Sequence, residues 1–138
     1  MKILKSRVLR IGVASLLAGG AMAAEHKGLP GTNWQLLGLG SVGAVEGALP
    51  TLSFGADGKV SGSGGCNTYT GTVTTSGMAI KFTGLTATKK SCSDELNKQE
   101  ATFLKALEKA TTFENRATSL LINTTEMPEP LSFVPAKM

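Results

Sequence analysis

The sequence predicts an α+β fold, in which about seven short antiparallel strands form a strongly bent sheet or partly open barrel and one helix lies in the C-terminal half. Two patterns lead to this prediction. Apolar and polar residues alternate with a period of two in several short segments that are bounded by Gly, Asp and Ser turns. Late in the chain, the period changes to that of one amphipathic helix, which we expect to cover a side or an end of the sheet.

The first 23 residues have the composition of a secretory signal. Residues 1–10 contain four basic residues and no acid, an apolar run follows, and small residues stand at Ala21 and Ala23, where a signal peptidase reads the chain. We therefore predict a signal peptide over residues 1–23 and a periplasmic or secreted mature protein. The apolar run is shorter than the roughly 20 residues that a membrane-spanning helix needs, so we expect no stable membrane anchor.

The excess of positive charge belongs to the predicted signal peptide. The sequence has 14 Lys and Arg against 10 Asp and Glu, and the four surplus basic residues all lie within residues 1–10. Removing 23 of the 138 residues leaves 115 residues of balanced charge, which argues against a nucleic-acid partner. That length suits one domain, which we expect to be a monomer.

The strands are predicted from segments in order. Residues 24–31 contain Gly and Pro and are interpreted as a flexible leader, so the domain is expected over residues 32–138. The first strand is expected over residues 32–39, and a Gly- and Ala-rich loop over residues 41–48. Asp57-Gly58 predicts a hairpin, because it joins two alternating segments and such pairs adopt positive φ readily. Further strands are expected over residues 51–56, 59–63, 69–75, 78–85, 112–114, 119–123 and 131–134.

A helix is predicted over residues 94–110. Ser93 suits the N-cap position, and two acidic residues follow it where the helix dipole favours negative charge. Glu100 interrupts the apolar face, because it lies about 40° from Leu96 on the helical wheel and so points toward the core. A buried carboxylate needs partners. Glu100 is therefore either a structural group that accepts hydrogen bonds from loop amides or Asn67, or a catalytic acid or base in a cleft.

Residues 62–71 are unusually rich in glycine. Such a run could cradle a phosphate, but phosphate loops lead from a strand into a helix, whereas this segment leads into a predicted strand. We interpret it as a bulge or tight bend that side chains would obstruct. The positions expected to serve as structural signature or binding residues are Gly62, Gly65, Asn67, Tyr69 and Gly71 here, with Thr88 and Glu100 later in the chain.

The chain contains two cysteines, Cys66 and Cys92. In an exported protein we expect a disulfide between them, which would stabilise the fold by about 3 to 4 kcal/mol through loop entropy. The alternative is a redox or metal-binding role, which the cysteine spacing and the single histidine, His26, disfavour. We expect no metal and no cofactor. We also expect no catalytic residue, because a lone Glu100 lacks the partner groups of glycosidase or triad chemistry.

Several short motifs recur in one known family. Gly65-Cys66-Asn67 is followed by Tyr69 and Gly71, and later by Thr88 and Cys92. Further matching segments are Trp34–Leu37, Leu52-Ser53-Phe54, Asp57-Gly58, Val60-Ser61-Gly62, Glu100, Phe103-Leu104, Leu107, Leu120 and Leu131-Ser132-Phe133. Together these residues resemble the META domain, the HslJ heat-shock protein family. The sequence departs from the family pattern at Lys89-Lys90, where a methionine is expected.

This resemblance implies a small envelope or secreted domain, linked in relatives to heat shock and to tolerance of novobiocin, with no agreed catalytic residues. We therefore expect an exported, non-enzymatic stress protein that binds an unknown protein or small molecule. One alternative is a protein inhibitor of a hydrolase or lysozyme-type enzyme, which would present the loop around Asn67 and Tyr69 to its target. Two further alternatives are an enzyme that uses Glu100 and a barrel that holds a lipophilic ligand.

Overall fold

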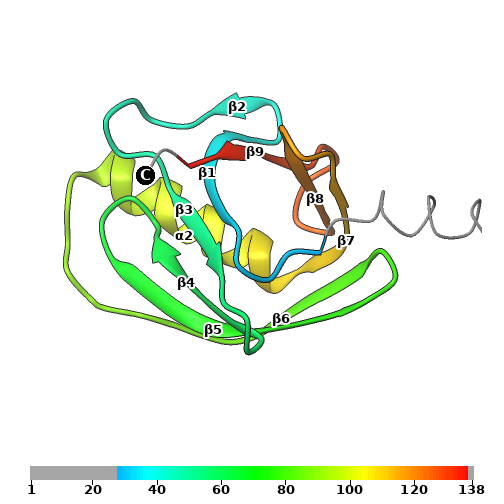
Figure 1. The fold of residues 1–138 in the computed structure, drawn as a ribbon. Coiled ribbons are helices and arrows are strands. Elements are labelled where there is room, and N and C mark those ends of the chain that lie inside the picture. Colours follow the sequence, from blue (N-terminus) through cyan, green and yellow to red (C-terminus); the bar gives the residue numbers. More distant parts are fainter. Residues whose placement is uncertain (1–27, 137–138) are drawn as a thin grey trace, which may run out of the picture.

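The computed structural model describes residues 28–136 and confirms the α+β fold class (Figure 1). An antiparallel sheet curls into a barrel, and within the described residues one helix, α2 (Asp94–Glu108), packs against it. The predicted signal peptide over residues 1–23 and the first part of the predicted leader lie outside the described residues. The strands are β1 (Asn33–Leu39), β2 (Val42–Gly43), β3 (Thr51–Phe54), β4 (Lys59–Ser63), β5 (Thr68–Ser76), β6 (Ala79–Ala87), β7 (Ala110–Asn115), β8 (Leu120–Thr124) and β9 (Leu131–Pro135).

The sheet, predicted as strongly bent or as a partly open barrel, closes fully into a barrel. The sheet runs in the order β2-β1-β3-β4-β5-β6-β7-β8-β9, and β9 pairs back onto β1. Trp34 of β1 therefore lies opposite Leu52 on one side and Pro135 on the other. Because β1 pairs with both β3 and β9, eight strands close the barrel. The short β2 is an additional edge strand, formed within the predicted loop over residues 41–48 when Val42 pairs with Leu39.

The helix lies where strand pairing is thinnest. β6 and β7 share a single registered pair, Ala79 with Thr112, together with a hydrogen bond from the Phe113 N–H to the Met78 carbonyl oxygen at 2.9 Å. The helix α2 connects these two strands in the chain and passes behind β3 and β4 in Figure 1, packing against β6. A helix that covers an incompletely paired strand edge protects it from pairing with another chain.

The interior of the barrel is filled with protein side chains. Phe103 of α2 contacts Tyr69 and Phe133 edge-on, with ring centroids 5.8 and 6.3 Å apart. The axis of the barrel is therefore occupied by the core, which does not support the alternative of a lipophilic ligand inside the barrel. Fully buried side chains include Leu36, Leu52, Val60, Tyr69, Phe103, Leu107, Leu120, Ile122, Leu131 and Phe133.

Residues 28–31, the described part of the predicted leader, pack onto the barrel. Leu29 is only 3% exposed and joins the hydrophobic core. The Gly31 N–H donates to the Phe54 carbonyl oxygen at 2.7 Å, and the Trp34 indole N–H donates to the Thr32 hydroxyl at 2.8 Å. Burial of one apolar side chain and these hydrogen bonds dock the segment onto β1 and β3, which its Gly and Pro content did not reveal.

Candidate functional site

The glycine segment forms a tight connection between β4 and β5. The Gly64 N–H donates to the Asn67 carbonyl oxygen at 2.8 Å, and the Gly65 N–H donates to the Ser63 hydroxyl at 3.1 Å. A Cβ atom at Gly64 would lie 2.6 Å from Cγ of Glu100, and Gly65 has φ of +115°. The loop therefore needs glycine both to approach the helix and to turn. It joins two strands, which is unlike a phosphate-binding loop.

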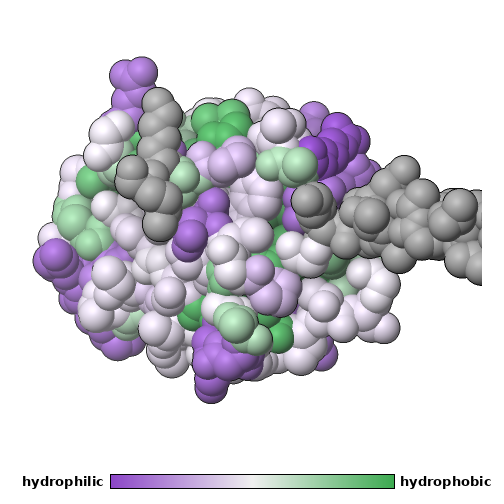
Figure 2. Space-filling view, in the orientation of Figure 1, coloured by the Kyte–Doolittle hydropathy of each residue, from purple (hydrophilic) through white to green (hydrophobic). Residues whose placement is uncertain are grey.

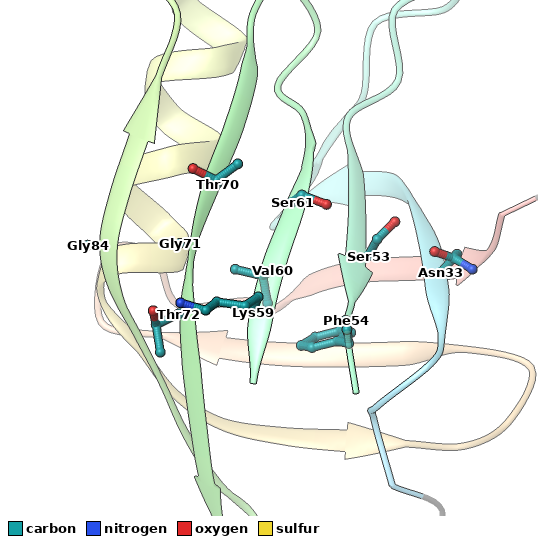
Figure 3. A pocket seen from close by; sticks show the side chains of 11 residues that line it. Asn33, Ser53, Phe54, Lys59, Val60, Ser61, Thr70, Gly71, Thr72 and Gly84 are labelled. Atoms are coloured by element: carbon teal, nitrogen blue, oxygen red, sulfur yellow. The ribbon is translucent and has the colours of Figure 1, made fainter. Parts of the chain in front are cut away.

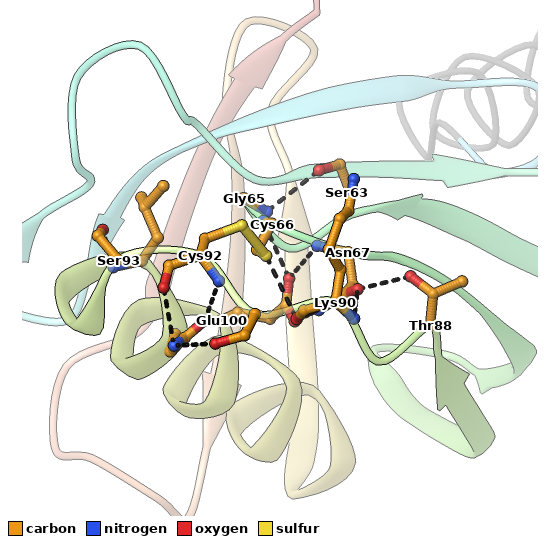
Figure 4. The surroundings of a disulfide bond; sticks show 12 residues. Ser63, Gly65, Cys66, Asn67, Thr88, Lys90, Cys92, Ser93 and Glu100 are labelled. Carbon is orange, nitrogen blue, oxygen red and sulfur yellow. Dashed lines mark hydrogen bonds between the residues drawn. A yellow bond between two sulfur atoms is a disulfide. The ribbon is translucent and has the colours of Figure 1, made fainter.

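The glycine loop wraps around the carboxylate of Glu100. Oε1 of Glu100 accepts the Cys66 N–H at 3.0 Å and the Asn67 N–H at 2.6 Å. Oε2 accepts Nδ2 of Asn67 at 2.7 Å. Glu100 is 8% exposed. Charge-assisted hydrogen bonds of this kind satisfy a buried carboxylate, so the arrangement is that of the structural alternative for Glu100 (Figure 4).

Asn67 connects three segments through its side-chain amide. Besides Glu100, its Nδ2 donates to the Lys90 carbonyl oxygen at 2.9 Å. Its Oδ1 accepts the Thr88 hydroxyl at 2.7 Å and the Lys90 N–H at 2.7 Å. Both donors and both acceptor positions of the amide are thus used. Asn67, Thr88 and Glu100, three of the positions expected to serve as structural signature or binding residues, thus meet at one amide, which holds the loop, the segment before α2 and the helix itself (Figure 4).

The predicted disulfide between Cys66 and Cys92 is confirmed. Their Cα atoms lie 6.0 Å apart, within the range that a disulfide spans. The second cysteine directly precedes the helix, where the Ser93 hydroxyl accepts the Leu96 N–H at 3.2 Å and so forms the predicted N-cap. The disulfide therefore joins the glycine loop to the start of α2, beside the hydrogen bonds of Asn67. We call Cys66, Asn67, Thr88, Cys92 and Glu100 the loop–helix node.

Tyr69 extends this node into the core. Its hydroxyl donates to the Thr51 carbonyl oxygen at 2.5 Å, and burial raises the pKa of Tyr69. Tyr69 and Asn67 are 2% and 5% exposed. Both side chains are committed inside this molecule, so an inhibitor that presents the loop around them would contact its target through other residues of that loop.

The two remaining predicted glycines lie in the strands beside the node. Gly62 is in β4, where a Cβ would overlap the Thr51 carbonyl oxygen. Gly71 is in β5 at a register shift, where a Cβ would lie 2.6 Å from Cδ2 of Leu85. Both positions are thus crowded by neighbouring strands and serve packing.

Gln99 belongs to this region and was missed by sequence reasoning. It is buried beside Glu100, accepts the Val45 N–H at 2.7 Å and donates to the Ala48 carbonyl oxygen at 3.1 Å. These bonds attach the loop after β2 to the helix. Its position three residues after Leu96 and four before Phe103, on the same helical face, was the signal that could have identified it.

The geometry offers little for chemistry around Glu100. Within residues 28–136, no group of three or more His, Cys, Asp and Glu side chains is arranged to hold a metal ion. The Glu100 oxygens are engaged by the loop, and Lys89 and Lys90 lie exposed beside it. In the same part of the chain, no helix is long and apolar enough to span a membrane.

A shallow hollow of about 630 Å³ lies on the outer face of the barrel (Figure 3). The side chains of Asn33, Ser53, Ser61 and Thr70 form one registered polar row across β1, β3, β4 and β5 at this hollow. Lys59 supplies a positive charge beside the row. A second hollow, of about 540 Å³, lies between the β1–β2 hairpin and α2. Glu100 and Asn67 line neither hollow.

Comparison with known proteins identifies the family. The model of the META domain matches residues 27–138, which is most of the chain. The chain belongs to the META domain family. This finding confirms the resemblance seen in the sequence, with the Gly65-Cys66-Asn67 motif inside the loop–helix node. None of the curated proteins matches the chain.

Solved structures show that the fold of this META domain occurs elsewhere. A protein from Burkholderia xenovorans, solved by NMR, has a TM-score of 0.65 and 22% identity, covering 100% of this chain and 99% of that one. A second NMR structure has a TM-score of 0.64 and 24% identity over 78% of this chain and 91% of that one. A crystal structure of a DUF4847 family protein from Bacteroides vulgatus has a TM-score of 0.58 and 17% identity, with coverages of 80% and 96%. At these identities the likeness is one of fold.

Proposed function

We propose that this META domain protein is an exported, non-enzymatic envelope stress protein that acts by binding a partner or ligand. The observation that carries the proposal is the loop–helix node. Its one carboxylate, on Glu100, is buried and engaged by three hydrogen-bond donors, and its two thiols form a disulfide. Groups committed in this way hold the fold together and leave none free to act as nucleophile or general base.

Export is supported by the redox state of the cysteines as well as by the sequence. Disulfides persist in oxidising compartments and are rare in the cytosol. A bridge between Cys66 and Cys92 is therefore compatible with a periplasmic or secreted protein that has lost residues 1–23. The face in Figure 2 is mostly polar or neutral, with small separated apolar groups, which is ordinary for a protein surface in contact with water. Tolerance of heat and of novobiocin is the stress function that the family resemblance implies.

Complementation of a strain that lacks the gene tests both parts of the proposal. The strain should receive the full chain, the chain without residues 1–23, or Glu100→Gln, and growth should be measured under heat and novobiocin stress. We expect rescue by the full chain and by Glu100→Gln, at a temperature where immunoblots show equal periplasmic amounts. We expect no rescue by the shortened chain. Rescue by the shortened chain would overturn export, and failure of equally abundant Glu100→Gln would overturn a non-enzymatic role.

A further inference from the structure

The second hollow has three walls that come from distant parts of the sequence. The β1–β2 hairpin contributes Leu39 to Gly43, and the turn from β8 to β9 contributes Met127 to Glu129. The third wall is a stripe of α2 that includes Glu95, Lys98 and Thr102, at the spacing of one helical face. With a volume of about 540 Å³, the hollow has the size of a small-molecule site.

The hairpin and turn walls are mainly apolar. Leu39, Val42, Val45, Met127 and Pro128 line the hollow. Val42 is 63% exposed, the largest value among the exposed large hydrophobic residues of the described chain. Covering such a side chain with an apolar ligand would remove its surface from water, which favours binding. The hollow therefore favours a ligand with an apolar body.

The walls are held in place before any ligand binds. Gln99 lies at the hollow and fixes the chain after β2 through its bonds to Val45 and Ala48. Gly40 turns the hairpin with φ of +62°, and a Cβ there would lie 3.0 Å from the Met127 sulfur, so the hairpin and the β8–β9 turn are in close contact. A preformed site loses less conformational entropy when it binds.

The charged residues at the hollow indicate which charge its ligand carries. Glu95, Glu129 and Lys98 all line it, and none of the three forms an ion pair within residues 28–136. Two carboxylates against one ammonium give the hollow a net negative charge. Uncommitted carboxylates beside an apolar surface favour a ligand with a positive group next to its apolar body.

We propose that this hollow binds a small amphipathic cation, with its apolar body against Val42 and Met127 and its positive group toward Glu95 and Glu129. This site deepens the proposed function, on which it rests, by assigning the binding role to a place and a ligand class. It lies outside the loop–helix node, although Gln99 and Glu100 are neighbours on the same helix.

Fluorescence of the neutral dye N-phenyl-1-naphthylamine with the purified protein tests the site, with octylammonium and octanoate as competitors of equal chain length. We expect saturable dye binding and displacement by octylammonium at a concentration about tenfold lower than that of octanoate. Val42→Asn should weaken dye binding at least about tenfold, whereas Met78→Asn, a substitution at a comparably exposed residue (50%), should leave it unchanged. The double variant Glu95→Gln, Glu129→Gln should lose the preference for octylammonium, and Glu108→Gln should retain it.

Three results would overturn the proposal: no saturable dye binding, stronger displacement by octanoate, or equal weakening by Val42→Asn and Met78→Asn. Circular dichroism on each variant separates loss of the site from loss of the fold. Because the measurement uses purified protein, its result does not depend on export. Cation binding together with failed complementation would overturn the proposed stress function and leave this site in place.

Discussion

Glu100 is the residue on which the loop–helix node depends most. Its carboxylate receives two backbone N–H groups and one amide from the glycine loop, and each of these donors would be left without its partner in a Glu100→Ala variant. Orphaned buried donors cost about 1 to 3 kcal/mol each. The side chain therefore contributes to stability through the hydrogen bonds that it accepts.

Glu100→Ala should lower the free energy of unfolding by at least about 3 kcal/mol. Glu100→Gln should cost less, about 1 to 3 kcal/mol, because one oxygen can still accept from the loop while its new amide faces Nδ2 of Asn67. Urea denaturation measures both values, and Glu108→Gln, at an exposed position of the same helix, is the matched control. Similar small losses in all three variants would contradict the role of the node.

Tyr69, the single tyrosine of the chain, gives a prediction about pH. Burial raises its pKa above the ordinary value near 10, so the folded state keeps a proton that the unfolded chain loses. The free energy of unfolding should therefore fall as the pH rises above about 10, by about 1.4 kcal/mol per pH unit from this group. Urea denaturation between about pH 8 and pH 11 measures the slope. Tyr69→Phe should remove this part of it, and an unchanged slope would contradict the assignment.

At the scale of elements, the disulfide and the helix start act as one unit. Cys92 precedes the N-cap Ser93, and Cys66 lies in the loop that Glu100 holds. Loss of the bridge in the double variant Cys66→Ser, Cys92→Ser should lower the free energy of unfolding by about 3 to 4 kcal/mol. Dithiothreitol should destabilise the wild-type protein to a similar extent and leave the double variant unaffected. A wild-type protein that is insensitive to complete reduction would argue against this unit.

Elements whose signals are local in the sequence were predictable. The helix begins at its expected cap, and the hairpin at Asp57-Gly58 joins β3 to β4, because caps and turns are decided by a few adjacent residues. The inward position of Glu100 followed from helical spacing alone. Loop amides and Asn67 were expected as its partners in the structural alternative, but the choice of the Cys66 and Asn67 amides among the loop amides was not predictable, since they come from a loop far away in sequence. β2 was missed because Val42 and Gly43 are held by pairing with β1 and carry no alternating pattern.

At the scale of the whole molecule, closure of the barrel joins the two ends of the described chain. The strand β1 pairs with β9, and Leu29 just before β1 is buried in the same core. The pairing of β1 with β9 could not be read from the sequence, because it depends on register between segments that are nearly the full chain length apart. The predicted α+β fold with a bent sheet or partly open barrel therefore holds, and the pairing of β1 with β9 adds the closure.

The docking of Leu29 can be tested against a residue of the same type. Leu29→Ala should cost about 2 to 3 kcal/mol of unfolding free energy, because it removes buried methyl groups from a packed core. Leu37→Ala, at a position that is 51% exposed, should cost less than about 1 kcal/mol. Urea denaturation of both variants measures the difference, and equal costs would contradict the packing of residues 28–31 onto the barrel.

The central claim is that this META domain works outside the cytoplasm as a disulfide-braced binding module. Mass spectrometry of the protein recovered from the periplasm of its host, with peptide mapping under non-reducing conditions, tests that claim most directly. We predict a mature chain that begins at Ala24 and a linked peptide pair that contains Cys66 and Cys92. A protein that remains in the cytoplasm with residues 1–23 attached, or one whose two thiols are free, would contradict it.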